Sequence, residues 1–203
     1  MSSAHVNLDD KNEYWSESFK NKDFSNLEIN AKEFDGCTFE NCDFSETTFK
    51  RCNFVDCEFI SCNLSIVNID YCKFSDVVFR DSKLIGINWT KVAWPSVIFS
   101  APFSFYKCIL NDSSFYGLSL QGLVLEECKA HHVDFRQADF SNANFSYSDL
   151  TGCVFSKTNL TSADFSEALN YDIDIFNNTL KKAKFSRFEA VRLLDSLAIE
   201  LVD

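Results

Sequence analysis

Large apolar residues recur at every fifth position along most of the chain. The first series of these residues runs from Phe24 to Phe99. One extra residue then enters the spacing, and a second series runs from Phe105 to Phe185, with Asn170 as an untypical member. Together the two series contain 33 five-residue units. A fixed internal period of this kind indicates a repeat architecture, so it takes precedence over the assignment of single elements.

The positions around each apolar centre are also patterned. The residue two places before the centre is small or apolar, the residue directly before it is often Asp or Asn, and the residue directly after it is often Ser. All nine cysteines lie two places before a centre: Cys37, Cys42, Cys52, Cys57, Cys62, Cys72, Cys108, Cys128 and Cys153. We expect the centre and the residue two places before it to face inward.

A period of five fits neither regular element. On an α-helix, successive centres would lie about 140° apart, and on a straight strand an odd step would reverse the buried face each time. The period is satisfied if the chain turns a corner every five residues, so that four sides close a square coil of about 20 residues. We therefore predict an all-β solenoid of about eight coils, stacked at a strand spacing of about 4.8 Å.

The two ends of the chain leave the repeat. Residues 1–21 are polar and are expected to form an N-terminal lead, and the solenoid itself is expected over residues 22–187. Ser186 and Glu189 have the spacing of a capping box, which predicts a helix from Glu189 to Ala198. A short strand is expected over residues 199–202.

The C-terminal segment, residues 188–203, has two possible roles. An open solenoid end exposes core and unpaired strand edge, so the helix is expected at least to cover its own last coil. Its apolar residues exceed what one cap needs, and this favours dimerisation through a two-fold interface. The residues expected in that interface are Phe188, Val191, Leu194, Leu197, Ile199 and Leu201.

The break between the two series contains both prolines of the chain, Pro95 and Pro102. Proline removes a donor from the ladder of hydrogen bonds, so it belongs at a corner or a bulge. We expect a bulge near residues 94–104. It is either a tolerated irregularity or a feature of shape that a partner recognises.

Composition excludes several classes of protein. The chain has 30 acidic and 19 basic residues and a net charge of −11, which argues against a basic nucleic-acid binder. It contains no apolar run of membrane-spanning length and begins without a secretory signal, so a cytoplasmic protein is expected. The cysteines form no C-x-x-C pair, and we interpret them as core residues in a reducing compartment in preference to a metal or redox site.

No motif for catalysis or for cofactor binding is evident. The chain has only five scattered glycines, no phosphate-binding loop and no nucleophile elbow. His131 and His132 are adjacent, but no further ligands stand at a suitable spacing, so surface positions are favoured over a metal site. We expect no catalytic residue, no cofactor and no metal.

The charge is uneven along the repeat. Residues 108–177 contain ten acidic and only three basic residues. Acids one coil apart are expected to align in columns, such as Asp139 beside Asn159 and Asp134 on the side of Val154. The candidate partner-binding residues are Asp112, Asp134, Asp139, Asp149, Asp164 and Asp174. Such a surface serves either solubility or recognition of a partner.

The five-residue consensus resembles the pentapeptide-repeat family, whose members form right-handed quadrilateral β-helices. Further stretches do not follow from the repeat and are similar to the topoisomerase-protecting branch of the family. That branch includes the albicidin-resistance and Qnr quinolone-resistance proteins, and the resemblance is closest to the albicidin-resistance type. The stretches are INWT at 87–90, AWPSV at 93–97, CILNDS at 108–113, FYGL at 115–118 and NYDIDIF at 170–176.

The resemblance implies a non-enzymatic dimeric rod that imitates the shape and charge of DNA. Such a rod would bind DNA gyrase and protect it from a poison, with the acidic columns standing in for phosphates. Many Qnr proteins carry long projecting loops, and this chain is expected to have none. Immunity to a peptide-like gyrase poison such as albicidin is therefore favoured over protection against fluoroquinolones. The alternative is a generic scaffold or regulator with another protein partner.

Overall fold

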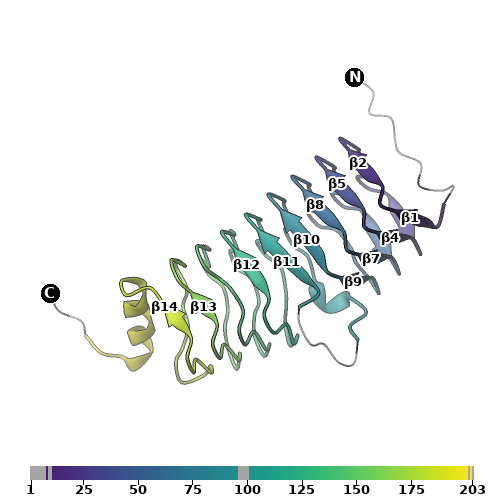
Figure 1. Cartoon of the computed structure of the whole chain (residues 1–203). Helices are drawn as coiled ribbons and strands as arrows, with labels where there is room; N and C mark the ends of the chain where they lie inside the picture. Colours follow the sequence, from purple (N-terminus) through teal and green to yellow (C-terminus); the bar gives the residue numbers. More distant parts are fainter. Residues whose placement is uncertain (1–7, 9–10, 96–100, 201, 203) are drawn as a thin grey trace.

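The chain winds into an elongated solenoid of about eight coils, closed at one end by a short helix (Figure 1). The computed structural model describes residues 8, 11–95, 101–200 and 202. All strand pairs in this described part are parallel, and each strand pairs with a strand of the next coil. The predicted all-β solenoid is confirmed.

The strands are short, and most contain three residues with the apolar centre in the middle. One side of the solenoid consists of β1 (Glu13–Trp15), β4 (Glu33–Asp35), β7 (Asn53–Val55) and β9 (Lys73–Ser75). The neighbouring side consists of β2 (Ser18–Lys20), β5 (Thr38–Glu40), β8 (Glu58–Ile60), β10 (Val77–Arg80), β11 (Phe103–Tyr106) and β12 (Val124–Glu126). The remaining pairs are β3 (Glu28–Asn30) with β6 (Thr48–Lys50), and β13 (Asp164–Phe165) with β14 (Lys184–Phe185).

Local hydrogen bonds explain the polar part of the repeat. The Asp or Asn before a centre accepts a hydrogen bond from the backbone N–H two residues later, as Asp43 Oδ1 does from Ser45 at 2.8 Å. This Asx turn shapes the corners at which Asp or Asn precedes the centre in this way. The second residue after the centre then adopts positive φ, and all five glycines of the chain occupy this position. Most corners hold a non-glycine residue instead, including the β-branched Ile66 at φ 59°.

Stacked side chains fill the interior. Phe39, Phe59 and Phe79 lie one above another with ring centroids 4.7 and 5.0 Å apart. All nine cysteines are buried and free, which confirms their interpretation as core residues. Most of their thiols contact the backbone carbonyl of a centre in the preceding coil, as Cys57 Sγ does with Phe34 O at 3.3 Å. Burial raises the pKa of the Cys57 thiol to about 12, so the thiol stays protonated.

Most neighbouring coils are in register at a spacing of 20 residues, but the coil that joins the two halves is longer. Asp43 lies opposite Asn63 and Asn63 opposite Lys83, whereas Lys83 lies opposite Ile109, so that coil contains six additional residues. The expectation of a single extra residue is therefore wrong. The lengthened side follows the 3₁₀ helix η1 (Trp89–Lys91) and contains both prolines. The unit centred on Phe99 falls within residues 96–100, which lie outside the described part.

The N-terminal boundary also differs from the prediction. Strands β1 and β2 lie within residues 1–21 and pair with β4 and β5. Tyr14 and Phe19 are buried centres of these strands. The solenoid therefore begins well before residue 22, and the expected lead is shorter than predicted. Tyr14 in place of Phe and the polar surroundings concealed these two units in the sequence.

A second change of register occurs near the C-terminal end. The five-residue spacing predicts Asn170 and Ile175 as centres, but Tyr171 and Ile173 are buried in their place. Ile173 lies opposite Phe155, so this coil is two residues shorter than the regular ones, and the regular length then returns. The large Tyr171 ring fills the core where Asn170 would have placed an amide, so burial of apolar area outweighs the regular spacing.

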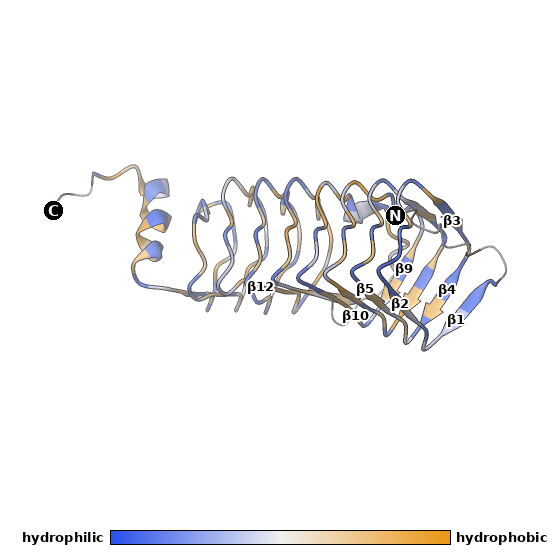
Figure 2. Cartoon of the chain, turned by 90° about the horizontal axis from the view of Figure 1, so that it is seen from above, coloured by the Kyte–Doolittle hydropathy of each residue, from blue (hydrophilic) through white to orange (hydrophobic). Residues whose placement is uncertain are grey.

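The C-terminal helix η2 (Glu189–Leu197) is a 3₁₀ helix that lies beyond the last coil (Figure 2). Its predicted extent is nearly right, but the capping box does not form. Ser186 Oγ instead donates to Glu167 Oε1 at 2.8 Å, and Glu189 accepts a hydrogen bond from Arg192. No strand follows in the described residues after the helix. None of the described helices is long and apolar enough to cross a membrane.

Candidate functional site

The candidate acids of the second half lie mostly in Asx turns. Asp134, Asp139, Asp149 and Asp164 each stand directly before a centre, and each accepts a hydrogen bond from the backbone N–H two residues later at 2.9–3.2 Å. Asp174 does the same with the N–H of Phe176. These carboxylates therefore help to form the corners of the solenoid and are only partly free to contact a partner.

Side chains of neighbouring residues neutralise or bind several of these acids. Asp134 forms a two-point ion pair with Arg136, at 2.8 and 2.7 Å. Asp164 pairs with Lys184 at 2.8 Å. Asp139 accepts hydrogen bonds from Gln121 and Asn159 of the adjacent coils.

Asp149 is the centre of a larger polar cluster. Its carboxylate accepts hydrogen bonds from Asn170 Nδ2 at 2.9 Å and Thr151 Oγ1 at 2.6 Å, and it contacts His131 Nε2 at 2.8 Å. Partial burial raises the pKa of Asp149, but the hydrogen bonds from Asn170, Thr151 and His131 outweigh burial and lower the pKa well below its usual range. His131 is thus the partner of a carboxylate.

The candidate acids do not form one continuous column. Asp134 lies opposite Val154, and Asp139 lies opposite Asn159, as the repeat predicts for residues one coil apart. However, these residues of the next coil are neutral in both cases, and Asp149 and Asp164 lie on two further sides of the solenoid. Asp112 stands at a corner with positive φ. The six residues are therefore distributed around the rod.

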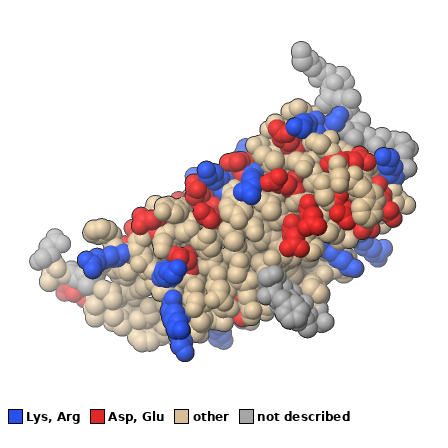
Figure 3. Space-filling view, viewed as in Figure 1, with Lys and Arg blue, Asp and Glu red and all other residues tan. Residues whose placement is uncertain are grey.

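A denser group of carboxylates lies at the other end of the molecule. We call Glu13, Glu33, Asp35, Asp56 and Asp76 the N-terminal acidic face. Glu13 is directly opposite Glu33 in the β1–β4 pair, and Asp35 follows in the same strand. Asp56 and Asp76 occupy corners that are bonded to the same side. Figure 3 shows acidic side chains concentrated over these N-terminal coils.

The acids of the N-terminal acidic face lack the internal partners found in the second half. Within the described residues, none of the five forms an ion pair, and only Asp76 accepts a side-chain hydrogen bond, from Ser75. Like charges directly opposite each other in a sheet destabilise it, so the pair of Glu13 and Glu33 is expected to lower the stability of the fold. This group is absent from the predicted site, although Asp35, Asp56 and Asp76, which stand after a centre and not before it, were a usable signal.

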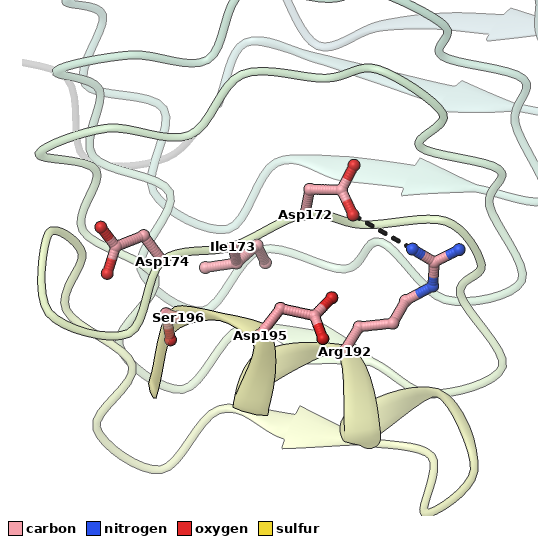
Figure 4. A pocket seen from close by; sticks show the side chains of 6 residues that line it. All are labelled: Asp172, Ile173, Asp174, Arg192, Asp195 and Ser196. Atoms are coloured by element: carbon pink, nitrogen blue, oxygen red, sulfur yellow. Dashed lines mark hydrogen bonds and ion pairs between the residues drawn. The ribbon is translucent and has the colours of Figure 1, made fainter. Parts of the chain in front are cut away.

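A cavity of about 280 Å³ lies between η2 and the last coil (Figure 4). Arg192 Nη1 donates to Asp172 Oδ1 at 3.1 Å across this junction. Asp174, Asp195 and Ser196 also line the cavity. The ion pair attaches the helix to the coil, and Leu193 packs partly buried against the core beside it. The expected capping role of the helix is therefore visible in its contacts.

One row at η2 is largely exposed, with only Leu194 half-buried. A 3₁₀ helix has three residues per turn, so side chains three apart lie in line. The predicted interface residues Phe188, Val191, Leu194 and Leu197 form such a row. Phe188 is 90% exposed and Val191 47% exposed, and Ile199 just after the helix is 53% exposed. Leu201, the last predicted interface residue, lies outside the described part.

The described residues contain no group of three or more His, Cys, Asp or Glu side chains that is arranged to hold a metal ion. His132 packs against the corner at Gly152, where an added Cβ would collide with the imidazole ring. Glycine is needed at this corner both for its positive φ and for this close approach.

Comparison with known proteins identifies the repeat. The model of the pentapeptide repeat region matches residues 32–102 and 87–165. No protein with a curated description matches the chain. Among solved structures, the chain is similar to trypsin-treated QnrB1, a plasmid-mediated fluoroquinolone resistance protein. The two are 25% identical over 94% of this chain and 90% of that one, with a TM-score of 0.43.

HetL, a protein involved in the regulation of heterocyst differentiation in the cyanobacterium Nostoc sp. strain PCC 7120, is 13% identical to the chain. The match covers 86% of this chain and 90% of HetL, with a TM-score of 0.44. The family model spans about two thirds of the sequence. The chain therefore belongs to the pentapeptide-repeat family.

Proposed function

We propose that this protein binds DNA gyrase or a related type II topoisomerase and protects it from a poison. It would present a rigid, negatively charged rod in the place of DNA, without catalysing a reaction, and it would act in the cytoplasm. The observation that carries the proposal is the N-terminal acidic face, whose carboxylates have no described ion-pair partner. The stretches that resemble the topoisomerase-protecting branch also support the proposal.

The physical basis of the proposal is charge density along an axis. Double-stranded DNA carries about one negative charge per 1.7 Å, and a protein that binds it presents clustered cations. Coils repeat at about 4.8 Å, and each coil of the N-terminal acidic face contributes one or two carboxylates. A surface of this kind attracts the same cations and accelerates association with them.

We also propose that two copies associate through the exposed row of η2, made of Phe188, Val191, Leu194 and Leu197, with Ile199. The row is apolar, lies at the end of the rod and points away from the contacts that hold Leu193 and Arg192 to the last coil. A second copy that presents the same row would bury it by a two-fold contact. The Leu194→Asp and Leu197→Asp variants should be monomeric by light scattering, and an unchanged dimer would contradict the assignment.

The class of poison needs a test with two compounds. One reason to favour a peptide-like poison such as albicidin is the expectation that no coil carries extra residues. The coil that contains η1 in fact has six more residues than its neighbours. The proposal for albicidin therefore loses one of its reasons, and a fluoroquinolone belongs in the same experiment.

The direct experiment is a supercoiling assay with purified gyrase. The full-length protein should restore supercoiling in the presence of albicidin, a fluoroquinolone or both, and it should bind gyrase when no drug is present. Failure to restore activity, together with no binding to gyrase, would contradict the proposal. In that case the alternative would stand, namely a scaffold or regulator for a different protein.

A further inference from the structure

The ladder between two coils is interrupted on the side that carries η1. On the preceding coil, Asn68 N–H donates to Thr47 O at 2.9 Å, and Asn68 O accepts from Phe49 N–H at 2.8 Å. One coil further, the equivalent bonds from Asn88 N–H to Val67 O and from Ile69 N–H to Asn88 O are missing within the described residues. Asn88 O instead accepts from Lys91 N–H inside η1.

Both corners beside the interruption remain bonded. Ile66 N–H donates to Ile85 O at 2.8 Å, and Tyr71 N–H donates to Lys91 O at 2.9 Å. The interruption is therefore a groove open to solvent and bounded at both ends by bonded corners, and not a frayed edge. Its volume is about 260 Å³, and its lining residues are Val67, Asn68, Ile69, Asp70, Gly86, Asn88 and Lys91.

The groove contains unused hydrogen-bonding groups of both kinds. The donors without a described partner are the backbone N–H groups of Ile69 and Asn88 and the ammonium group of Lys91. The acceptors are the carbonyl of Val67 and one carboxylate oxygen of Asp70, whose other oxygen accepts from Asn68 Nδ2 at 3.4 Å. Asp70 and Lys91 form no ion pair with each other, although both line the groove.

We infer that this groove binds a small zwitterion, namely a free amino acid or a short peptide with an apolar side chain. The ligand carboxylate would accept hydrogen bonds from the Ile69 and Asn88 N–H groups and pair with Lys91. The ligand ammonium group would donate to Val67 O and pair with Asp70. Charge-assisted bonds of this kind are the stronger ones, and backbone groups left without partners gain most from a ligand.

The rim of the groove favours an apolar side chain on the ligand. Ile66 and Tyr71 stand at its two corners, 64% and 63% exposed, and both have positive φ. Val67 and Ile69 border the groove mainly with their backbone, because their side chains are buried in the core.

The test is a titration of the full chain with L-leucine, followed by the amide resonances of Ile69 and Asn88. Leucine should shift both resonances, whereas N-acetyl-leucine, without an ammonium group, and leucinamide, without a carboxylate, should bind at least about tenfold more weakly. No shift at about 20 mM leucine, or equal shifts with all three compounds, would overturn the inference.

Variants provide a second readout. The Lys91→Met and Asp70→Asn variants should each weaken leucine binding by about tenfold or more. The matched controls Lys83→Met and Asp81→Asn alter exposed charges of the same coil outside the groove and should leave the binding unchanged. Equal binding by Lys91→Met, Asp70→Asn and the wild type would contradict the site. Gyrase is absent from this experiment, so its result is independent of the proposed protection.

Discussion

The carboxylates of the two halves of the rod differ in what holds them. In the second half, Asp134, Asp149 and Asp164 sit in Asx turns and have charged or hydrogen-bonding partners. In the first half, Glu13 and Glu33 face each other in the ladder and have no described ion-pair partner. Residues 108–177 contain ten acidic and only three basic residues, yet the N-terminal acidic face, whose acids have no described ion-pair partner, lies outside that segment. Counting charges along a repeat therefore does not locate an acidic surface.

The cores of the two halves differ as well. In the first half, aromatic centres stack over cysteines, as in the series that includes Phe39, Phe59 and Phe79. In the second half, alanines replace most cysteines, and leucine centres such as Leu120 and Leu160 are frequent. Both solutions fill the same square coil. Stacked rings also occur in the second half, as between Phe145 and Phe165.

The largest expected effect is in the aromatic core. The Phe59→Ala variant would leave a cavity between the rings of Phe39 and Phe79 and should lower the free energy of unfolding by about 3–5 kcal/mol. The matched Leu160→Ala variant in the second half should cost less, about 2–4 kcal/mol. Urea denaturation of both variants measures the difference. A larger loss for Leu160→Ala would contradict the role assigned to the stacked rings.

The next effect concerns the polar cluster of the second half. The Asp149→Asn variant should lower the free energy of unfolding by about 1–2 kcal/mol at pH 7, because it weakens charge-assisted bonds. The pKa of Asp149 is lowered in the folded state, so this contribution is complete above the unfolded pKa of about 4 and is lost as the pH falls further.

Urea denaturation midpoints of the wild type and the Asp149→Asn variant at pH 7, 5 and 3 test this pH dependence. The difference in midpoint between the wild type and Asp149→Asn should become smaller only at pH 3. Asp56→Asn in the N-terminal acidic face serves as the control and should have little effect on stability at pH 7. A constant difference for Asp149→Asn at all three values would exclude the ionic explanation.

A smaller effect, of opposite sign, is expected at Tyr171. Its ring is fully buried, and its hydroxyl has no partner among the described residues. Burial raises the pKa of Tyr171 to about 12, so the hydroxyl stays neutral. The Tyr171→Phe variant removes the unsatisfied group with little loss of volume and should raise the free energy of unfolding by about 1 kcal/mol. Thermal unfolding measures this gain, and a destabilised variant would indicate an undetected partner.

The smallest effect separates the two kinds of acid. The Glu33→Gln variant removes the repulsion from Glu13 and should raise the free energy of unfolding by a few tenths of a kcal/mol. Glu28→Gln is the control, because Glu28 lies opposite the neutral Thr48 in the next coil. A loss of stability in Glu33→Gln, relative to Glu28→Gln, would show that Glu33 has a structural role.

The regular part of the fold was predictable because burial enforces it. Centres such as Phe39 and Phe59 must face inward at every turn, so their five-residue spacing is visible in the sequence. The longer coil was not predictable, because Trp94 and Phe99 continue the five-residue spacing in the sequence. The structure instead places Lys83 opposite Ile109, 26 residues later. At Tyr171, a large ring one place after the expected centre enters the core instead of Asn170.

The candidate site was harder to predict for a different reason. Asp134 and Asp139 are conspicuous in the sequence because the corner of each coil requires a short acceptor at that position. The Asx turn explains why these acids recur, and it also gives each of them a backbone N–H as a hydrogen-bond partner. Glu33 and Asp56 recur less regularly, so their grouping appears only when the coils are stacked.

The most direct test of the proposed role of the N-terminal acidic face compares how well two variants protect gyrase. Each variant carries four substitutions, in the N-terminal acidic face or in the second half. One variant carries Glu13→Gln, Glu33→Gln, Asp56→Asn and Asp76→Asn, and the other carries Asp134→Asn, Asp139→Asn, Asp149→Asn and Asp164→Asn. Both must be folded at the assay temperature by circular dichroism. The concentration that restores half of the supercoiling in the presence of the poison should rise at least about tenfold for the first variant and little for the second. The reverse order would contradict the assignment of the N-terminal acidic face.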